Sequence, residues 1–227
     1  FTGRTEKDCE RFVALAGEVL VGSGDTLNEG NNWGDDLLDE SIGTQLQKLL
    51  KHQKRAIVFI DGDNLDKLLH KMGIILDFNK LFDFFNDRFD LVRMIYYTAL
   101  KSDNEYDNRH KLVDFLSYNR YKIVSKHTRV FHDPKTKKIT YKGNLDVEFA
   151  VDMVTMVDSY DTAILISGDS DFVKAVDYVQ RIGKKVIVAH SKQSGMLGDE
   201  LLRISDDFVE LAKLKGITSP RNSGASQ

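Results

Sequence analysis

The sequence predicts an α/β fold built around a mostly parallel sheet. From residue 56 onward, short apolar runs alternate with segments of helical periodicity, which is the pattern of βα units. The predicted strands are residues 56–60, 91–99, 121–125, 162–167 and 185–190. Helical segments separate most of these runs, so neighbouring strands are expected to run in the same direction.

Helical periods fill the intervals between the strands. The predicted helices are residues 64–71, 78–88, 106–118, 144–158, 171–182 and 196–203, with a final helix over 206–214 that Asp206 is expected to cap. One stretch departs from this rhythm, because TRVFH and KITYK flank the turn-forming segment DPKTK. That pattern predicts a β-hairpin over residues 128–142, at the edge of the domain.

The chain of 227 residues suits one α/β domain with appendages. Residues 1–53 are predicted to be an acidic N-terminal arm that is partly helical, over 5–21 and 36–52, with a loop rich in Gly and Asn between. Residues 54–215 form the predicted α/β domain. Residues 216–227 have almost nothing to bury and are expected to be a flexible tail.

Composition excludes several classes of protein. Hydrophobic residues make up 41% and charged residues 30% of the chain, with only 2 prolines, which is typical of a globular protein rather than a disordered or fibrous one. The single cysteine, Cys9, allows neither an internal disulfide nor a cysteine metal cluster, so a reducing, cytoplasmic setting is expected. No apolar run approaches the roughly 20 residues needed to span a bilayer, so no membrane association is expected.

The net charge of −3 conceals an uneven distribution. Residues 1–50 contain ten acidic and four basic residues, whereas residues 120–142 contain eight basic residues and one acidic residue. Tyr121, Phe131 and Tyr141 are interleaved with these cations. Cations that neutralise phosphates, together with aromatic stacking surfaces, suit a single-stranded nucleic acid. A solvated hairpin with no binding role is the alternative, and the sequence leaves both open.

Carboxylates follow the predicted strands at one edge of the sheet. The strand 56–60 runs into DGDN (61–64), the strand 162–167 into GDSD (168–171), and the helix 144–158 opens with KGNLD (142–146). Ligands of parallel sheets collect beyond the carboxyl ends of the strands, so these segments are expected to share one rim. Asn64 and Ser170 could instead be simple helix caps.

Four of these acids are the candidate metal ligands: Asp61, Asp146, Asp169 and Asp171. Asp61 directly follows apolar strand residues, where an ionised carboxylate costs desolvation unless a cation or hydrogen-bond donors meet it. Gathered in one cleft, the four carboxylates would repel one another and raise one another's pKa unless divalent cations neutralise them. Ligands that are all oxygen suit Mg²⁺ or Mn²⁺.

These segments also carry a resemblance to a known family. VFIDGDN (58–64), KGNLDVEFAVDM (142–153), LISGDSDF (165–172), GKKVIVAH (183–190) and LLRISDDFVEL (201–211) look like the NYN domain, a branch of the PIN-like nucleases close to the LabA-like proteins. The resemblance covers roughly residues 54–214 and keeps the family's order of motifs. It implies a three-layer α/β/α sandwich of the Rossmann-like type and RNA cleavage that depends on a divalent metal.

The resemblance also suggests roles for individual residues. It implies that Asp61, Asp146, Asp169 and Asp171 bind Mg²⁺ or Mn²⁺ and that Asn64 assists catalysis. Asp152 and Ser167 are interpreted as supporting residues behind the ligands. The predicted partner is single-stranded RNA, cut internally, and a homodimer is left open. We expect RNA contacts from the hairpin and its base, by Arg129, Lys135, Lys137, Lys138, Tyr141 and Lys142.

Other readings fit the residues less well. Haloacid dehalogenase-like phosphatases share the Asp-x-Asp spelling, but they continue with Gly-Thr where this chain has Asn64-Leu65, and they require an acid where Val173 stands. A calcium loop fails at Leu65, which occupies a ligand position. His127 and His132 make a metal-free ribonuclease a minor option. A catalytically weak RNA-binding or regulatory scaffold with a retained metal pocket remains the main alternative.

Overall fold

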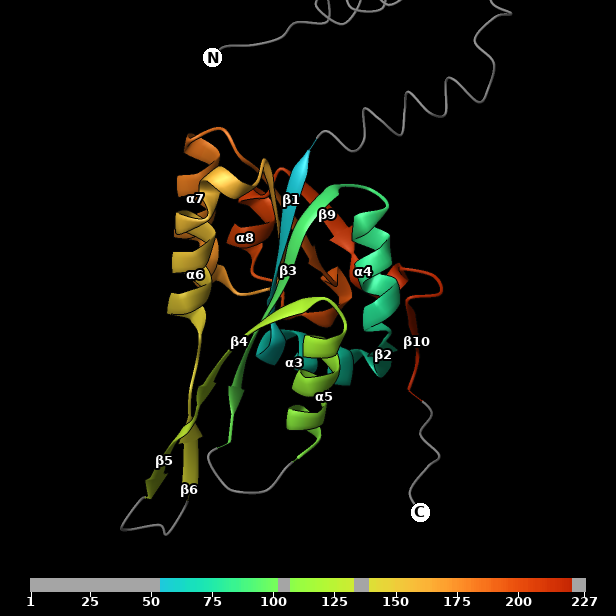
Figure 1. Cartoon of the computed structure of the whole chain (residues 1–227), viewed down its shortest axis with the longest axis vertical. Helices are drawn as coiled ribbons and strands as arrows, with labels where there is room; N and C mark the ends of the chain where they lie inside the picture. The colour runs from blue at the N-terminus through green and yellow to red at the C-terminus, as the bar shows by residue number, and fades with distance from the viewer. Residues whose placement is uncertain (1–53, 102–106, 133–138, 222–227) are drawn as a thin grey trace, which may run out of the picture. The chain divides into compact units, whose positions relative to one another are not determined.

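A six-stranded, entirely parallel sheet forms the centre of the fold (Figure 1). The computed structural model describes residues 54–101, 107–132 and 139–221, with only the backbone of residues 129–132 and 139–142. The strand order is β4-β3-β1-β7-β8-β9. In that order the strands are Tyr121–His127, Asp90–Leu100, Arg55–Asp61, Thr162–Ile166, Lys185–His190 and Asp207–Glu210.

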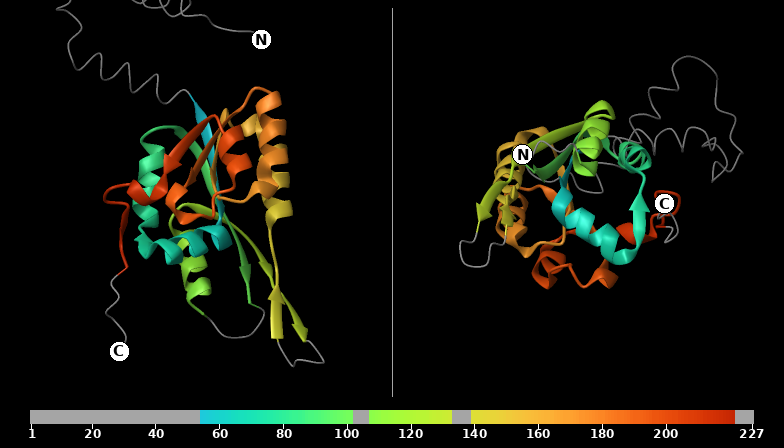
Figure 2. Two further views of the ribbon diagram at one scale, coloured as in Figure 1. Left: turned by 180° about the vertical axis from the view of Figure 1, so that it is seen from behind. Right: turned by 90° about the horizontal axis from the view of Figure 1, so that it is seen from below.

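Helices cover both faces of this sheet, which gives three layers (Figures 1 and 2). One face packs against α3 (Gly62–Met72), α4 (Phe78–Asn86) and α5 (Asn108–Tyr118). The other packs against α6 (Asp146–Thr155), α7 (Val173–Arg181) and α8 (Asp199–Ile204). The α/β/α sandwich with a parallel sheet is therefore confirmed.

The central strand β1 shows why this sequence forms a buried parallel strand. Residues 56–60 are all apolar, and each has 0% of its surface exposed. Val58 and Ile60 face one core cluster, whereas Ile57 and Phe59 face the other. Because helices bury both faces, the strand carries a continuous apolar run instead of an alternating one.

Shorter elements complete the described chain. Four 3₁₀ helices are η1 (Val157–Ser159), η2 (Ser170–Phe172), η3 (Lys192–Ser194) and η4 (Leu211–Lys213). The predicted hairpin is formed by β5 (Arg129–His132) and β6 (Ile139–Lys142), which pair antiparallel and extend away from the three layers (Figure 1). Its predicted turn, DPKTK, lies outside the described residues.

The predicted final helix over 206–214 is wrong, because residues 207–210 form strand β9 and residues 211–213 the 3₁₀ helix η4. Phe208 packs in one core cluster and Val209 in the other, as strand geometry requires. Asp206 is therefore no helix cap. Its carboxylate accepts hydrogen bonds from Val186 N (2.7 Å) and Gln180 Nε2 (2.9 Å).

The predicted flexible tail is also corrected over its first residues. β10 (Thr218–Pro220) pairs antiparallel with β2 (Ile74–Leu76), and Ile217 is buried. The helices differ from the prediction at their ends; α6 begins at Asp146 and α8 covers only 199–204. The predicted arm 1–53 and the last six residues of the tail lie outside the described residues.

Candidate metal centre

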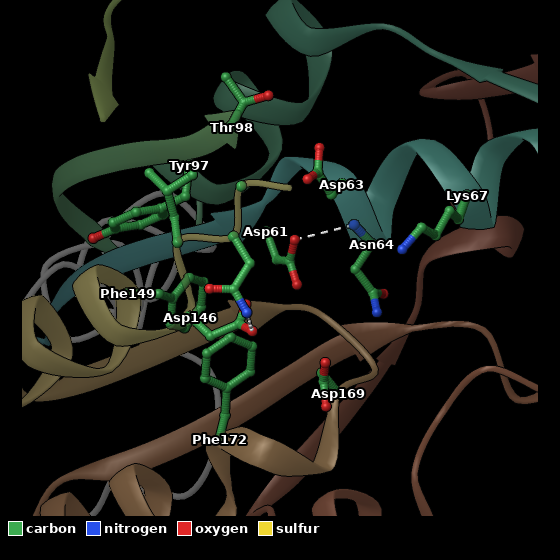
Figure 3. A pocket seen from close by; sticks show the side chains of 13 residues that line it. Asp61, Asp63, Asn64, Lys67, Tyr97, Thr98, Asp146, Phe149, Asp169 and Phe172 are labelled. Carbon is green, nitrogen blue, oxygen red and sulfur yellow. Dashed lines mark hydrogen bonds between the residues drawn. The ribbon is translucent and has the colours of Figure 1, made fainter. Parts of the chain in front are cut away.

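A pocket opens at the carboxyl edge of the sheet, where β1 and β7 end and α6 begins (Figure 3). Its volume is about 240 Å³, which is room for an ion with its waters and a phosphate group. Acidic side chains face it from three separate segments of chain. The lining residues are Asp61, Asp63, Asn64, Lys67, Tyr97, Thr98, Gly143, Asn144, Leu145, Asp146, Phe149, Asp169 and Phe172.

Three aspartates converge at this edge. One carboxylate oxygen each from Asp146, Asp169 and Asp171 lies within 4.8 Å of the others. Asp146 is the first residue of α6, and Asp169 caps η2 by accepting a hydrogen bond from Asp171 N (3.0 Å). Burial raises the pKa of Asp146, and the charges of Asp169 and Asp171 raise it further. The carboxylates repel one another, so a cation between them would be favoured.

The geometry of this group fits a small divalent cation. Adjacent oxygen ligands of an octahedral Mg²⁺ lie about 3 Å apart and opposite ligands about 4 Å apart. The three carboxylate oxygens already lie close to that range, so a small closing movement would let all three bind one ion. Oxygen donors suit Mg²⁺ or Mn²⁺ and disfavour softer metals.

Asp61 lies in the same pocket but is not a member of the close group. Its Oδ1 accepts a hydrogen bond from Asn64 N (3.0 Å), which caps α3, and its Oδ2 accepts one from Ser167 Oγ (3.1 Å). Burial raises the pKa of Asp61 to about 6 against these two donors, and the charges of Asp146 and Asp63 add to the rise. Asp61 is thus a partly buried acid whose pKa depends on the charges of neighbouring aspartates.

Asn64 ties helix α3 to the loop that carries Asp169. Its Oδ1 accepts a hydrogen bond from Gly168 N (3.0 Å) and lies 3.0 Å from Nε2 of His190. The backbone N–H can only donate, so the oxygen of the Asn64 amide must be the atom that faces it. His190 is fully buried at the end of β8, and burial lowers its pKa. A neutral His190 can therefore donate from Nε2.

Ser167 and Asp152 both contact residues of the pocket. Ser167 is fully buried, donates to Asp61 and accepts a hydrogen bond from Asp169 N (3.2 Å), so it connects two of the predicted ligands. Asp152 accepts a hydrogen bond from the hydroxyl of Tyr97 (2.9 Å), and Tyr97 lines the pocket. Asp152 therefore holds a wall of the pocket and does not face the acids.

A comparison with family models identifies the domain. The NYN domain model matches residues 55–212 of this chain, which is well over half of it. This chain belongs to the NYN domain family. A LabA protein of Synechococcus elongatus, named "Low amplitude and bright protein LabA", is 29% identical over 164 residues, covering 71% of this chain and 86% of LabA. The family is one of PIN-like nucleases.

A solved structure supports the fold. A Vibrio parahaemolyticus protein of unknown function is similar with a TM-score of 0.58 and 20% identity, over 70% of this chain and 94% of that protein. At this identity the likeness concerns the fold alone. Within the described ranges, no helix of the NYN chain is long and apolar enough to cross a membrane.

Several residues of the NYN pocket were not predicted from the sequence. Asp63 forms an ion pair with Arg109 of α5, and Arg109 also contacts Asp66 (2.6 Å) and the carbonyl of Ala99 (3.3 Å). Lys67 contributes a positive charge to the same pocket. Asp63 stands inside the DGDN segment, so its place at the pocket could have been inferred. Nothing in the sequence connects Arg109 with it.

The side chains of the predicted RNA-binding residues are outside the part of the chain that the structure describes. Lys135, Lys137 and Lys138 fall outside the described residues, and only the backbone of Arg129, Tyr141 and Lys142 is described. The hairpin strands pair in the register Arg129 opposite Lys142. Residues 143–145, directly after β6, line the pocket. The base of the hairpin is therefore next to the acids, and the RNA contacts themselves stay a prediction.

The raised pKa of Asp61 predicts a pH dependence of stability. The ordinary pKa is 3.8 and that in the fold is about 6, so between these values the folded chain binds more protons than the unfolded one. This group's contribution to the free energy of unfolding therefore falls as pH rises from about 4 to 6, by about 3 kcal/mol. At neutral pH without metal, the ionised Asp61 destabilises the fold.

The measurement is the difference in free energy of unfolding between the wild-type chain and Asp61→Asn, since other groups also titrate in this range. Urea unfolding in chelator at pH 4, 5, 6 and 7 should show Asp61→Asn gaining on the wild type by about 3 kcal/mol between pH 4 and pH 7. A difference that stays constant with pH would contradict the shift.

Proposed function

We propose that this NYN domain is a metal-dependent endoribonuclease that hydrolyses phosphodiester bonds of single-stranded RNA. One observation carries the proposal: carboxylate oxygens of Asp146, Asp169 and Asp171 approach within 4.8 Å at the mouth of a pocket, in a chain that belongs to a family of PIN-like nucleases. Acids at this spacing repel one another, so a role in binding a cation explains the arrangement better than a structural role does.

The three close aspartates would hold Mg²⁺ or Mn²⁺, and Asp61 would complete the site directly or through a water. When bound, the cation supplies an acidified water and a positive charge facing the phosphate. Water adds to phosphorus, the bond to the leaving oxygen breaks, and that oxygen takes up a proton. Hydrolysis of this kind consumes no other reactant.

The other residues of the pocket prepare this reaction. Ser167 orients Asp61 and the backbone of Asp169, while Asn64 fixes the loop at Gly168. Phe149 and Phe172 line the pocket, and their rings stack with centroids 4.2 Å apart, which gives the pocket an apolar wall. Preorganised carboxylates cost little reorganisation during the reaction.

The test is an assay of the purified chain of residues 1–227 on labelled single-stranded RNA and DNA. We expect cleavage of RNA with Mn²⁺ or Mg²⁺ and none with chelator, because the aspartates alone provide no activated water. Cleavage that continues in chelator would overturn the metal mechanism. Binding of RNA without cleavage under any metal would instead support the scaffold alternative.

Metal binding can be tested separately from catalysis. Mn²⁺ should raise the thermal midpoint of the full chain, because a ligand that binds only the folded state stabilises it. The stabilisation should be lost on adding chelator. No change in midpoint at millimolar Mn²⁺ would remove the basis for the proposed site.

A further inference from the structure

A second, shallower hollow adjoins the metal pocket. It is lined by Asp66, Lys67, His70 and Lys71 of α3 and by Met196, which follows η3. Lys67 lines both hollows, so the two adjoin at this residue of α3. We call this second hollow the α3 groove. It has no role in the mechanism above.

The cations of the α3 groove form a stripe on the helix. Asn64, Lys67 and Lys71 are spaced i, i+3 and i+7, so they lie on one face of α3 and lead away from the acids. Lys67 and Lys71 are exposed, and no carboxylate of the described residues lies within ion-pair distance of either. Asp66, the one acid in the groove, is already paired with Arg109.

The other wall of the groove, at Met196, belongs to a segment that is hydrogen-bonded to the loop carrying Asp169. Gly198 N donates a hydrogen bond to Gly168 O (2.8 Å), and Met196 N donates to Ser194 Oγ (3.1 Å). A Cβ placed at Gly195 would lie 3.7 Å from Nζ of Lys71, so this cation stands against the wall. The groove thus has a firm apolar side at Met196 and a positively charged side on α3.

We propose that the α3 groove binds the sugar-phosphate backbone of single-stranded RNA where it leaves the metal pocket, an inference that rests on the proposed nuclease function. Lys67 and Lys71 neutralise successive phosphates, and Met196 and the ring of His70 offer surfaces for a base. Cations that pair with no carboxylate of the described residues suit phosphates, because binding a phosphate breaks no ion pair seen there.

Sheet order gives this groove a place in the path of the substrate. The hairpin emerges beyond β4 and residues 195–198 follow β8, whereas the acids lie over β1 and β7 between them. An RNA strand that contacts both the hairpin and the α3 groove therefore passes over the acids, and nucleotides of the same strand extend on both sides of them. Such a path favours cleavage within a chain over removal of end nucleotides.

A simpler role for His70 and Lys71 is to stabilise the helix. Both stand in the last turn of α3, where positive charges interact favourably with the helix dipole. That role predicts a small loss of stability on substitution and no specific effect on RNA. The experiment must therefore measure binding and stability together.

The experiment measures binding of a labelled, unstructured RNA of about 20 nucleotides to the chain of residues 1–227 in chelator, by fluorescence anisotropy. The variants are Lys71→Glu and the double variant Lys67→Glu/Lys71→Glu. The matched control is Lys54→Glu, an exposed lysine just before β1, at the opposite edge of the sheet. Each is also tested with an RNA of about 4 nucleotides and with DNA, and each thermal midpoint is measured.

We expect the double variant to bind the longer RNA at least about tenfold more weakly than Lys54→Glu, and the dependence of log Kd on log salt to fall by about 1.4, which corresponds to two lost phosphate contacts. The loss should be smaller for the short RNA. Equal affinities and salt slopes for the double variant and Lys54→Glu would overturn the groove, and a lowered midpoint as the sole effect would assign these cations to the helix dipole.

Failure of the groove and failure of the nuclease are distinguishable, because binding is measured without metal. RNA binding that depends on Lys71 in a chain that never cleaves RNA would support the groove and reject the proposed activity. Metal-dependent cleavage with Lys71→Glu behaving like Lys54→Glu would do the reverse. Equal losses of affinity for RNA and DNA would show that the groove recognises the phosphates and not the sugar.

Discussion

Replacement of Asp169 by asparagine should lower metal-dependent RNA cleavage at least about a hundredfold and leave the fold intact. Loss of residues that merely support a metal ligand already costs about 10- to 100-fold, so loss of a ligand's charge should cost at least as much. An asparagine oxygen can still accept the hydrogen bond from Asp171 N, so the cap of η2 is retained. Removal of one negative charge also relieves repulsion with Asp146.

The measurement is the initial rate of RNA cleavage in Mn²⁺, together with the thermal midpoint with and without the metal. Asp199→Asn is the control, because Asp199 is an exposed acid of α8 that forms only a loose ion pair, at 3.9 Å, with the exposed Arg203. The control should cleave like the wild type. An Asp169→Asn chain that cleaves at the parental rate would refute the assignment of this residue to the metal site.

Replacement of Gly168 by alanine should damage both stability and metal binding. A Cβ at this position would lie 2.6 Å from the carbonyl oxygen of Met196 and 2.9 Å from Nε2 of His190. His190 is fully buried and the other atom belongs to the backbone, so the loop that carries Asp169 must shift. Overpacking of this kind costs about 1–3 kcal/mol. We also expect Mn²⁺ affinity to fall about tenfold or more, since a shift of the loop would strain its hydrogen bond from Gly168 N to Asn64.

Gly183→Ala separates this local effect from a general cost of losing a glycine. Gly183 has a φ of +84° and nothing within 4 Å of an added Cβ, so its substitution strains only the backbone, by about 1–2 kcal/mol. Urea unfolding and Mn²⁺ titration would be compared for the two variants. A Gly168→Ala chain that loses stability like Gly183→Ala and keeps its Mn²⁺ affinity would show that the loop adapts without moving Asp169.

Local patterns were sufficient for most of the fold. Strand β1 was predictable because its five central residues are apolar on both faces, which only a two-sided core requires. The segment that contains β9 was misread because its apolar residues, Phe208, Val209 and Leu211, fit a short helix as well as a strand. Its pairing with β8 decided between the two, and that pairing lies outside the local sequence.

The candidate site was predictable to a similar extent. The rule that ligands gather beyond the carboxyl ends of parallel strands is enough to select Asp61, Asp146 and Asp169 from the sequence. It could not separate Asp61, held by Asn64 N and Ser167, from the close group. It also gave no reason to connect Arg109 with Asp63, because the two are 46 positions apart in the chain.

By itself, the sequence determined the α/β class, the edge of the sheet at which the acids stand and the membership of the NYN family, because apolar periodicity and motif order are properties of neighbouring residues. Only the tertiary structure decided which acids approach one another, which groups hydrogen-bond to Asn64 and which groove the lysines of α3 line. Those features depend on contacts between segments such as α3 and β8, whose distance in space is set by the order of strands in the sheet.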